Sequence, residues 1–491
     1  MREYVTEISK YIIAISMALY TYECFAVFRF RDEDSRRGIY LRQNILMFTI
    51  QFLCFLDLTL ASRNMEYLFF YLFVQVFLLT AVNIVGMIYE KSNRLLINNM
   101  CMLLGVGFCM ISRLSFQKAL KQYVIVLISL VIVLFIPYLM NRILFFKKLT
   151  WLYAAAGILL LSGVLILGEV THGSKISFSI GGLAFQPSEF VKIIFIFFLA
   201  GALCENISFR RVAVTTALAA IHVLVLVMSK DLGSALIFFI GYLFVVFIAT
   251  RNYWYLLAGV LGGCAASYGA YLIFDHVKVR VLAWQDPWKY IDNQGYQITQ
   301  SLFAIVSGSW FGAGLNKGNP SAIPFVDVDF IFSSVCEELG VIFGICLILV
   351  CISCFVMMMD IAVRLKDRFY RLIAYGLGIM YIFQIFLTIG GGIKFIPLTG
   401  VTLPFVSYGG SSVMTTMILF FIVQGLYMKM QQEGEKRLVR KKKANSGNSA
   451  AGNPAAKAKA AEGRRGTTDA KAGAVKGKQG TTDAKAGTVK K

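Results

Sequence analysis

Charged residues are scarce in this sequence. Asp, Glu, Lys and Arg make up only 15% of its 491 residues, against roughly 25% in soluble domains. Hydrophobic residues make up 58%, and the mean hydropathy is +0.69. This balance excludes an ordinary soluble domain and indicates an integral membrane protein. Alternating segments of about ten residues, the pattern of a membrane barrel, are also absent, so we expect membrane-crossing helices.

Three further absences narrow the possible functions. None of the ten cysteines falls between residues 275 and 329, and the CxxC of Cys351 and Cys354 lies in an apolar run without a second pair. We therefore expect core cysteines, not a metal or redox site. No cleavable secretory signal is recognisable, and we expect the first apolar stretch to stay as an anchor. The basic C-terminal segment lacks interleaved aromatic residues, which argues against a nucleic-acid partner.

Long apolar runs are what the sequence does contain. Many reach 18 residues or more, enough for a helix to cross a ~30 Å hydrocarbon core. One run, from 212 to 249, is too long for a single span, and Lys230, Asp231 and Gly233 interrupt it, which predicts a tight hairpin. About thirteen helices are expected, at 9–30, 40–61, 67–89, 97–115, 119–140, 149–168, 186–204, 211–229, 231–249, 253–274, 330–358, 369–393 and 404–430.

Basic loops predict the orientation. The positive-inside rule assigns Lys- and Arg-rich loops to the cytoplasm, and the basic segments fall on one side if the spans alternate. The N-terminus and the long segment 275–329 are then outside, and the C-terminus is cytoplasmic. The basic segments are 28–42, 90–94, 141–148, 209–211, 364–371 and the C-terminal tail.

The tail holds about half of the net charge of +21. From 433 to 491 there are 16 Lys or Arg and 5 Asp or Glu, a net +11, and "GTTDAKAG" occurs at both 466–473 and 480–487. Such a low-complexity segment cannot bury a core. We expect a disordered cytoplasmic tail whose charge attracts it to anionic membrane lipids.

Two polar clusters mark the starts of apolar spans, and polar groups near membrane depth are functional candidates. In "FQPSEFVK", Pro187 suits a first helical turn and Glu189 lies where the helix dipole favours an anion. Lys192 is one turn further on, so an ion pair with Glu189 is feasible. In "SKDLGSAL", Asp231 opens a helix. Helix capping and a local ion pair explain both clusters without any further function.

A third cluster is the segment 275–329. It contains "WQDPWKYIDNQGYQITQS", with Asp286 and Asp292, and Arg280 lies just before it. A loop of about 50 residues is unusual unless it is functional or disordered, and its aromatic residues argue against disorder. We therefore expect a site in this segment, on the same side as the other clusters.

The fourth cluster is "GGGIKFIPLTGVTLPFVSYGGSS", residues 390–412. Its Gly and Pro break the helix pattern, and irregular backbone at membrane depth is tolerated only where it lines a cavity or is buried in protein. Lys394 is placed to meet an anion, and Ser407 lies in the same segment. Composition and spacing leave both an enzyme and a transporter open.

Six sequence motifs follow one another along the chain: "RL....A..Q" from Arg113, "QPSEF.K", "DLGSA", "W.DPW.....GYQ..QS", "DFIF....EELG" and "PLTGVTLPFVSYGGSS". Together they resemble the SEDS family, whose members include FtsW, RodA and SpoVE. The last element is highly specific. The resemblance covers about 97–430 and implies the ten helices typical of the family, with three helices before residue 97 lying outside it.

The resemblance implies a peptidoglycan glycosyltransferase. Such enzymes polymerise lipid II at the outer face of the bacterial cytoplasmic membrane, in division, elongation or sporulation, usually with a class B penicillin-binding protein. A divalent cation, Mg²⁺ or Mn²⁺, is implied as well. The chemistry requires a base within ~3 Å of the attacking sugar hydroxyl. It also requires positive charge for the departing pyrophosphate, in place of the second carboxylic acid of a glycosidase.

In the family the catalytic aspartate lies five residues before the Gly of GYQ, and Tyr290 occupies that column here. Asp292, three residues before Gly295, is our first choice for the general base. Asp286 is the second choice, although its DPW setting also suits a structural turn. The further candidates for lining the cavity or binding substrate are Glu189, Lys192, Asp231, Arg280, Lys394 and Ser407.

The predicted fold is all-α: extra N-terminal helices at 1–96, a SEDS-like core at 97–432 with an extracellular loop at 275–329, and a tail at 433–491. Two other functions remain. A lipid II flippase should show inverted repeats and helices broken at the midplane, and we find no such repeat among the apolar spans. A non-catalytic scaffold for the penicillin-binding protein stays open because the expected aspartate column holds Tyr290.

Overall fold

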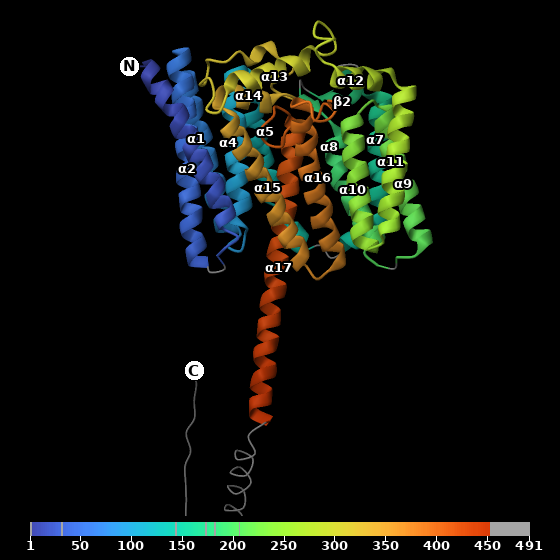
Figure 1. Cartoon of the computed structure of the whole chain (residues 1–491). Coiled ribbons are helices and arrows are strands. Elements are labelled where there is room, and N and C mark those ends of the chain that lie inside the picture. Colours follow the sequence, from blue (N-terminus) through green and yellow to red (C-terminus); the bar gives the residue numbers. More distant parts are fainter. Residues whose placement is uncertain are drawn as a thin grey trace, which may run out of the picture. The chain divides into compact units, whose positions relative to one another are not determined.

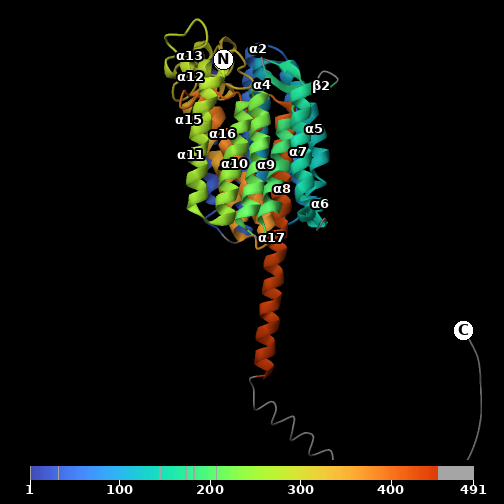
Figure 2. The same ribbon diagram turned by 90° about the vertical axis from the view of Figure 1, so that its right-hand side faces the viewer.

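A computed structural model of the chain describes residues 2–30, 33–142, 145–171, 174–180, 183–205 and 207–451. The chain divides into two compact units, Met1–Gln431 and Gln432–Lys491. The first unit gathers its long helices into one bundle (Figures 1 and 2). Both GTTDAKAG repeats of the predicted disordered tail lie outside the described residues.

Eleven helices in the described ranges are long and apolar enough to cross a membrane. This confirms an all-α polytopic membrane protein. Each of the thirteen expected segments contains a helix, but α1 (Arg2–Ala26) and α8 (Pro187–Leu203) are not among the eleven. The tight hairpin expected near residue 230 is also present, because α9 (Phe209–Met228) ends and α10 (Leu232–Thr250) begins around a Lys230 with φ of 61°.

The three expected N-terminal helices are α1 (Arg2–Ala26), α2 (Glu33–Ser62) and α3 (Glu66–Ile88). They lie at one edge of the bundle in Figure 1, where α1 packs on α2 and α15 (Val341–Arg364). A buried hydrogen bond joins them to the following helix, from the hydroxyl of Tyr20 to Asn99 Oδ1 at 3.0 Å. Because polar side chains are costly in hydrocarbon, such a bond fixes how these apolar helices face one another.

Helix α4 (Arg94–Leu114) is buried along its whole apolar window, because α2, α3, α5 and α15 surround it. The remaining elements follow along the chain. They are α5 (Phe116–Val133), α6 (Ile136–Arg142), η1 (Phe145–Leu149), α7 (Thr150–Leu167), β1 (Glu169–Thr171), β2 (Ser174–Ile180), β3 (Leu183–Phe185), α8 (Pro187–Leu203), α11 (Tyr253–Ile273), α12 (Asp275–Gln285), α13 (Tyr296–Gly308), η2 (Pro320–Ala322), α14 (Ile331–Leu339), α16 (Arg368–Gly392) and α17 (Gly410–Ala451).

Several boundaries differ from the sequence prediction. The span expected at 119–140 is two helices, α5 and α6, and α17 continues to Ala451, into the start of the segment that we expected to be a disordered tail. The span expected at 330–358 is two helices, α14 and α15, separated at Gly340, whose φ is 94°. A Cβ there would lie 2.5 Å from the backbone of Trp310 and Gly312, so only glycine allows this close turn. The last span begins at Gly410, not at 404, because the preceding Gly- and Pro-rich residues form an irregular loop.

The polar segment 275–329, called the insert below, folds into α12, α13 and η2, which lie with α14 at one end of the bundle (Figures 1 and 2). The three-stranded antiparallel sheet β1–β2–β3, which we did not expect from the sequence, is at the same end. We call this end the loop end. Both α8 and α10 begin there, so their N-terminal dipoles point toward the insert.

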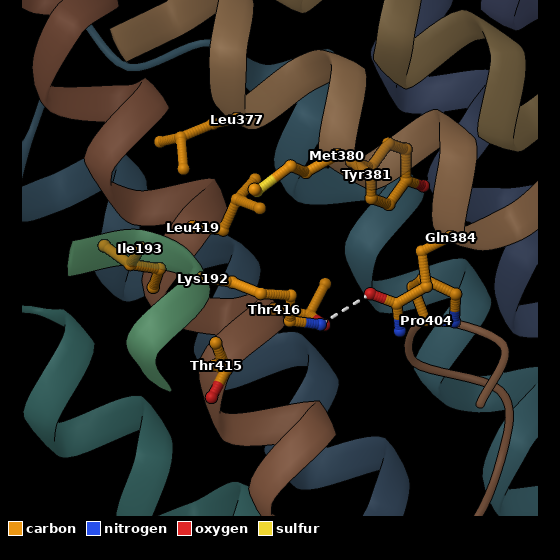
Figure 3. Close-up of a pocket in the computed structure, with 10 residues that line it drawn as sticks. All are labelled: Lys192, Ile193, Leu377, Met380, Tyr381, Gln384, Pro404, Thr415, Thr416 and Leu419. Atoms are coloured by element: carbon orange, nitrogen blue, oxygen red, sulfur yellow. Dashed lines mark hydrogen bonds between the residues drawn. The ribbon is translucent and has the colours of Figure 1, made fainter. Parts of the chain in front are cut away.

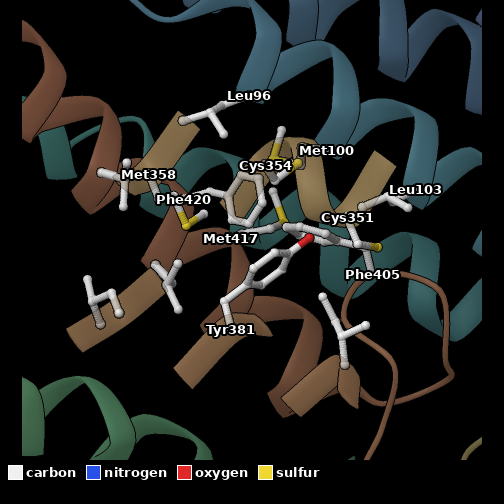
Figure 4. Packing of buried hydrophobic residues seen from close by; sticks show 14 of the residues in the cluster. Leu96, Met100, Leu103, Cys351, Cys354, Met358, Tyr381, Phe405, Met417 and Phe420 are labelled. Carbon is white, nitrogen blue, oxygen red and sulfur yellow. The ribbon is translucent and has the colours of Figure 1, made fainter. Parts of the chain in front are cut away.

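Large side chains fill the centre of the bundle (Figure 4). The ring of Tyr381 on α16 packs edge-on against Phe420, with centroids 5.4 Å apart, and Phe405 packs against Phe420 at 4.8 Å. Cys351 and Cys354 lie buried and unbridged in this cluster, which confirms that this CxxC belongs to the core.

Candidate active site

A buried ion pair lies at the start of α8. Pro187 occupies the first turn of the helix, as predicted, and places Glu189 in that turn. Lys192 Nζ lies 2.8 Å from Glu189 Oε2, and both side chains are more than nine-tenths buried. The predicted pair is therefore confirmed. Its burial is unusual for two charges and requires further polar partners.

Gln384 of α16 is one such partner. Lys192 Nζ donates to Gln384 Oε1 at 2.8 Å (Figure 3), and Gln384 Nε2 donates to the carbonyl of Thr402 at 3.0 Å. A small cavity adjoins these groups and is also lined by Tyr381 and Thr415. Our sequence analysis did not select Gln384. The signal was present, since it is a polar residue within the apolar run 369–393.

Asp231 joins the starts of α8 and α10. Its Oδ1 accepts the backbone N–H of Ser234 at 3.1 Å, which is the predicted helix cap. Its Oδ2 accepts from the hydroxyl of Ser188 at 3.2 Å and from Gln186 Nε2 at 3.4 Å. Burial raises the pKa of the Asp231 carboxyl, and the hydrogen bonds from Ser234 and Ser188 oppose that rise. The site thus has a second fixed carboxylate close to the buried ion pair.

Arg280 of α12 anchors the irregular loop that follows α16. Its Nη1 donates to the carbonyls of Leu398 and Thr399 at 3.2 Å and 3.1 Å. Burial lowers the pKa of this guanidinium, while Asp329 and Asp231 act in the opposite direction. Arg280 remains protonated at neutral pH because its unperturbed pKa is above 12. It places a positive charge at the loop end.

Asp329 is a second residue that our sequence analysis did not select. It lies in the segment before α14 and is partly buried beside Arg280. Burial raises its pKa to about 6, although Arg280 acts to lower it. Its only sequence signal was membership of the "DFIF" element, and the sequence could not tell which partner its carboxylate would face.

Two other predicted residues have different surroundings. Ser407 is buried; its hydroxyl donates to the carbonyl of Val328 at 2.5 Å and accepts from the N–H of Leu403 at 2.9 Å, so it holds the loop together. Lys394 has a φ of 61°, and its backbone carbonyl accepts from Trp284 Nε1 at 3.2 Å. Within the described residues the ammonium of Lys394 meets no acceptor, and it stays available for an anion.

The two loop aspartates are exposed in the turn between α12 and α13. Asp286 Oδ1 accepts the backbone N–H of Lys289 at 3.2 Å, which fits the structural turn considered for the DPW motif. No hydrogen-bond donor in the described ranges meets the carboxylate of Asp292. The structure does not bring either aspartate into contact with Lys192, and the choice between them stays a prediction.

Polar contacts between distant segments hold the loop end in place. Arg113 Nε lies 2.9 Å from Glu338 Oε1, whose side chain is fully buried. Lys118 Nζ lies 2.6 Å from Asp327 Oδ2. Gln122 donates to the carbonyl of Ser407 at 3.1 Å and accepts the N–H of Gly409 at 3.0 Å. These contacts fix the irregular backbone that surrounds the site.

The donor set for a divalent cation is sparse. No cluster of three or more His, Cys, Asp or Glu side chains arranged for a metal occurs within the described part of the chain. Mg²⁺ bound to a substrate phosphate commonly uses only one or two protein carboxylates, with water and phosphate oxygens filling the other positions. The residues of the loop end therefore fit a cation carried by a pyrophosphate, but not a preformed metal cage.

The comparisons with known proteins match the part of the chain that contains these residues. A sequence model of the FtsW, RodA and SpoVE proteins, described as cell cycle protein, matches residues 94–432, which is more than half of the chain. The chain belongs to this family. The first three helices precede the matched region.

Among curated relatives of the FtsW/RodA/SpoVE family, the chain is 36% identical over 269 residues to "Peptidoglycan glycosyltransferase RodA" of Mycobacterium tuberculosis (strain ATCC 25618 / H37Rv). That match covers 51% of this chain and 57% of the relative. A second match is 32% identical over 287 residues to "Probable peptidoglycan glycosyltransferase FtsW" of Aliivibrio salmonicida, covering 56% of this chain and 70% of that protein. The chain thus spans little more than half the length of the RodA relatives.

Solved structures of the family share the fold. A chain from a peptidoglycan synthase complex, studied for its coordination of polymerization and crosslinking, superposes with a TM-score of 0.60 at 25% identity. That match covers 70% of this chain and 99% of the other. RodA of Thermus thermophilus superposes with a TM-score of 0.53 at 23% identity, covering 69% of this chain and 97% of that protein. These structures therefore share the fold of about 70% of this chain.

Proposed function

We propose that this protein is a peptidoglycan glycosyltransferase that polymerises glycan strands from lipid II. The observation that carries the proposal is the group of polar residues at the loop end, made by motifs that occur in the order typical of the family. Lys192 lies on α8, Asp231 caps the start of α10 and Arg280 lies on α12. The relatives named glycosyltransferases support the same activity.

The proposed reaction is an inverting displacement. The 4-hydroxyl of an acceptor sugar attacks the anomeric carbon of the donor, the new C–O bond forms, and the bond to the pyrophosphate oxygen breaks with its electron pair. Arg280 and Lys394 are cations of the loop end that can stabilise the departing pyrophosphate. Lys192 holds the deeper part of the site through Glu189 and Gln384.

A divalent cation, Mg²⁺ or Mn²⁺, fits this proposal as a charge on the pyrophosphate. Its contribution would be to neutralise the negative charge that develops on the leaving group. Asp292 and Asp329 are carboxylates of the loop end that no hydrogen-bond donor meets within the described residues, so either can approach such a cation. The first-choice base of the sequence analysis remains Asp292.

We also propose the membrane setting and the partner. The loop end faces the outside of a bacterial cytoplasmic membrane, because the basic segments then lie in the cytoplasm. A class B penicillin-binding protein is the proposed partner, since a solved relative belongs to a synthase complex that couples polymerization to crosslinking. Both proposals are testable on the intact chain.

The test is polymerisation of labelled lipid II by the purified full chain, alone and with a co-expressed class B penicillin-binding protein, with Mg²⁺ or Mn²⁺. We expect glycan polymer that lengthens with time and is lost in the Lys192→Met variant. The absence of polymer under every condition would sink the enzyme proposal and favour a scaffold. Movement of fluorescent lipid II across proteoliposomes without polymerisation would instead favour a flippase.

A further inference from the structure

A second cavity lies at the end of the bundle opposite the loop end. It has a volume of about 120 Å³ and is formed where η1 meets the start of α7, the end of α8 and the first turn of α9. One water needs about 10–15 Å³ of such space, so this cavity can hold a polar group of several heavy atoms. None of the residues assigned to the proposed reaction lines it.

Three cations line this cavity. Lys147 and Lys148 belong to η1, directly before α7, and Arg211 lies in the first turn of α9. Within the described residues no acceptor meets the ammonium of Lys148 or the guanidinium of Arg211. Both side chains are therefore available to a bound group.

Lys147 is held at the edge of the cavity by the start of α16. Its Nζ lies 2.9 Å from Asp367 Oδ2. The other oxygen of Asp367 accepts the backbone N–H of Phe369 at 2.9 Å, which is the N-terminal cap of α16. An ammonium group has three N–H donors, so this one carboxylate leaves donors of Lys147 for a further acceptor.

The charges around the cavity do not cancel. Lys147, Lys148 and Arg211 carry three positive charges. Asp367 and the exposed Glu205, which also lines the cavity, carry two negative charges, which leaves a net +1. A ligand with a single negative charge, such as a phosphodiester, would balance this sum.

These cations also lie at helix ends that favour the opposite charge. The N-terminus of a helix carries a partial positive charge, which attracts anions and repels Lys and Arg. Lys147 and Lys148 nevertheless directly precede α7, and Arg210 and Arg211 lie in the first turn of α9, while neither first turn contains an acidic residue. A bound anion would relieve this repulsion, and phosphate groups bind at helix N-termini for the same reason.

Aromatic side chains place the cavity at the depth of the lipid headgroups. Trp151 lines the cavity from α7 and is exposed, and Phe209 is exposed at the start of α9. Trp is enriched where the hydrocarbon core meets the headgroups. The positive-inside rule accounts for basic residues at this end, but it does not account for a cavity between them.

We propose that this cavity binds a phosphate group with one negative charge, held by Lys148, Arg211 and the remaining donors of Lys147. The site is separate from the proposed reaction and does not depend on it. Two sources offer this chemistry, the headgroup of an anionic phospholipid and a soluble phosphate, and the position of Trp151 favours the lipid. Basic pockets between membrane helices bind phospholipid headgroups on the cytoplasmic side, where the proposed orientation places this end.

The test measures binding of phosphatidylglycerol to the full chain in detergent by native mass spectrometry, with inorganic phosphate in a separate arm. Each Lys or Arg near an anionic lipid contributes about a fivefold factor in affinity, so Lys148→Gln with Arg211→Gln should weaken binding about 25-fold. Lys148→Arg with Arg211→Lys keeps both charges and should bind as the wild type does. Diacylglycerol with the same chains lacks the phosphate and should bind far more weakly.

The matched control is Arg29→Gln with Arg37→Gln. It removes two exposed cations where α1 is followed by α2, at the same end of the bundle (Figure 1), and should leave the affinity unchanged. The C-terminal tail is present in every variant, so its attraction to anionic lipid cancels from the comparison. Equal unfolding temperatures without added lipid would show that the loss of binding is not a loss of folding.

The two arms distinguish the sources of the phosphate. Binding of phosphatidylglycerol that only the Lys148 and Arg211 glutamine variant loses supports a lipid ligand, and saturable binding of inorganic phosphate with the same dependence supports a soluble one. Three results would overturn the site: equal affinity of that variant and the wild type in both arms, equal losses in that variant and the control, and diacylglycerol that binds as tightly as phosphatidylglycerol.

Discussion

Replacing Lys192 with methionine removes one charge from a buried pair and keeps most of the side-chain volume. The two charges lie 2.8 Å apart, so their Coulomb attraction is about 6 kcal/mol at an effective dielectric constant of about 20. Much of that energy is offset by the loss of hydration when both charges are buried. The larger effect is that the substitution leaves Glu189 charged and unpaired, which typically costs about 3–5 kcal/mol.

We expect Lys192→Met to lower the unfolding temperature in detergent clearly below that of the wild type. Glu189→Gln combined with Lys192→Met should recover most of the loss, because no uncompensated charge then remains. Activity should stay low in the double variant, since Lys192 also donates to Gln384 in the site. The control is Lys278→Met, which breaks an exposed pair of the same i,i+3 spacing and should cost less than about 1 kcal/mol.

The assay is thermal unfolding of purified full chain, followed by intrinsic fluorescence, with all variants in one detergent and at one pH. A Lys192→Met protein that unfolds at the wild-type temperature would refute the buried-pair reasoning. A double variant that is as unstable as the single variant would do the same. Either result would mean that water or lipid headgroups compensate the charge of Glu189.

Three other changes test separate parts of the molecule. Gly295→Ala places a Cβ 2.3 Å from the carbonyl oxygen of Pro287, so the loop must shift and the rate of polymerisation should fall at least ~10-fold. The control is Gly262→Ala, whose Cβ meets nothing within 4 Å and which should retain activity. Equal rates for the two variants would contradict the close packing at Gly295. Folding raises the pKa of the Glu338 carboxyl from 4.5 to about 7, mainly because the group is buried. The protonated carboxyl therefore contributes roughly 3 kcal/mol to the free energy of unfolding below pH 4.5, and this contribution is lost as the pH rises through about 7. Glu338→Gln should therefore flatten the dependence of unfolding temperature on pH over this window, and an unchanged slope would count against the shift. Deleting 452–491, which carries ten Lys or Arg and three Asp or Glu, should weaken binding of the protein in nanodiscs to anionic vesicles, most at low salt; binding that neither salt nor deletion alters would exclude charge attraction.

The positions of most helices were predictable because a helix that crosses the membrane must be apolar along its length. Hydrocarbon requires about 20 apolar residues per helix, so the spans follow from composition alone, and the hairpin at Lys230 follows from its interrupting polar residues. The break at Gly340 was not predictable in this way. Apolar character continues across it, and the turn depends on contact with the backbone of Gly312 and Trp310.

The sequence by itself determined the membrane class, the family motifs and the local contacts, namely the Glu189–Lys192 pair and the cap at Asp231. These depend on neighbours within one helical turn, so spacing decides them. Only the tertiary structure decided that Lys192 meets Gln384, 192 residues away, and that Asp329 lies beside Arg280. Such contacts depend on how helices and loops pack together, so the spacing of residues along the chain does not reveal which distant side chains meet.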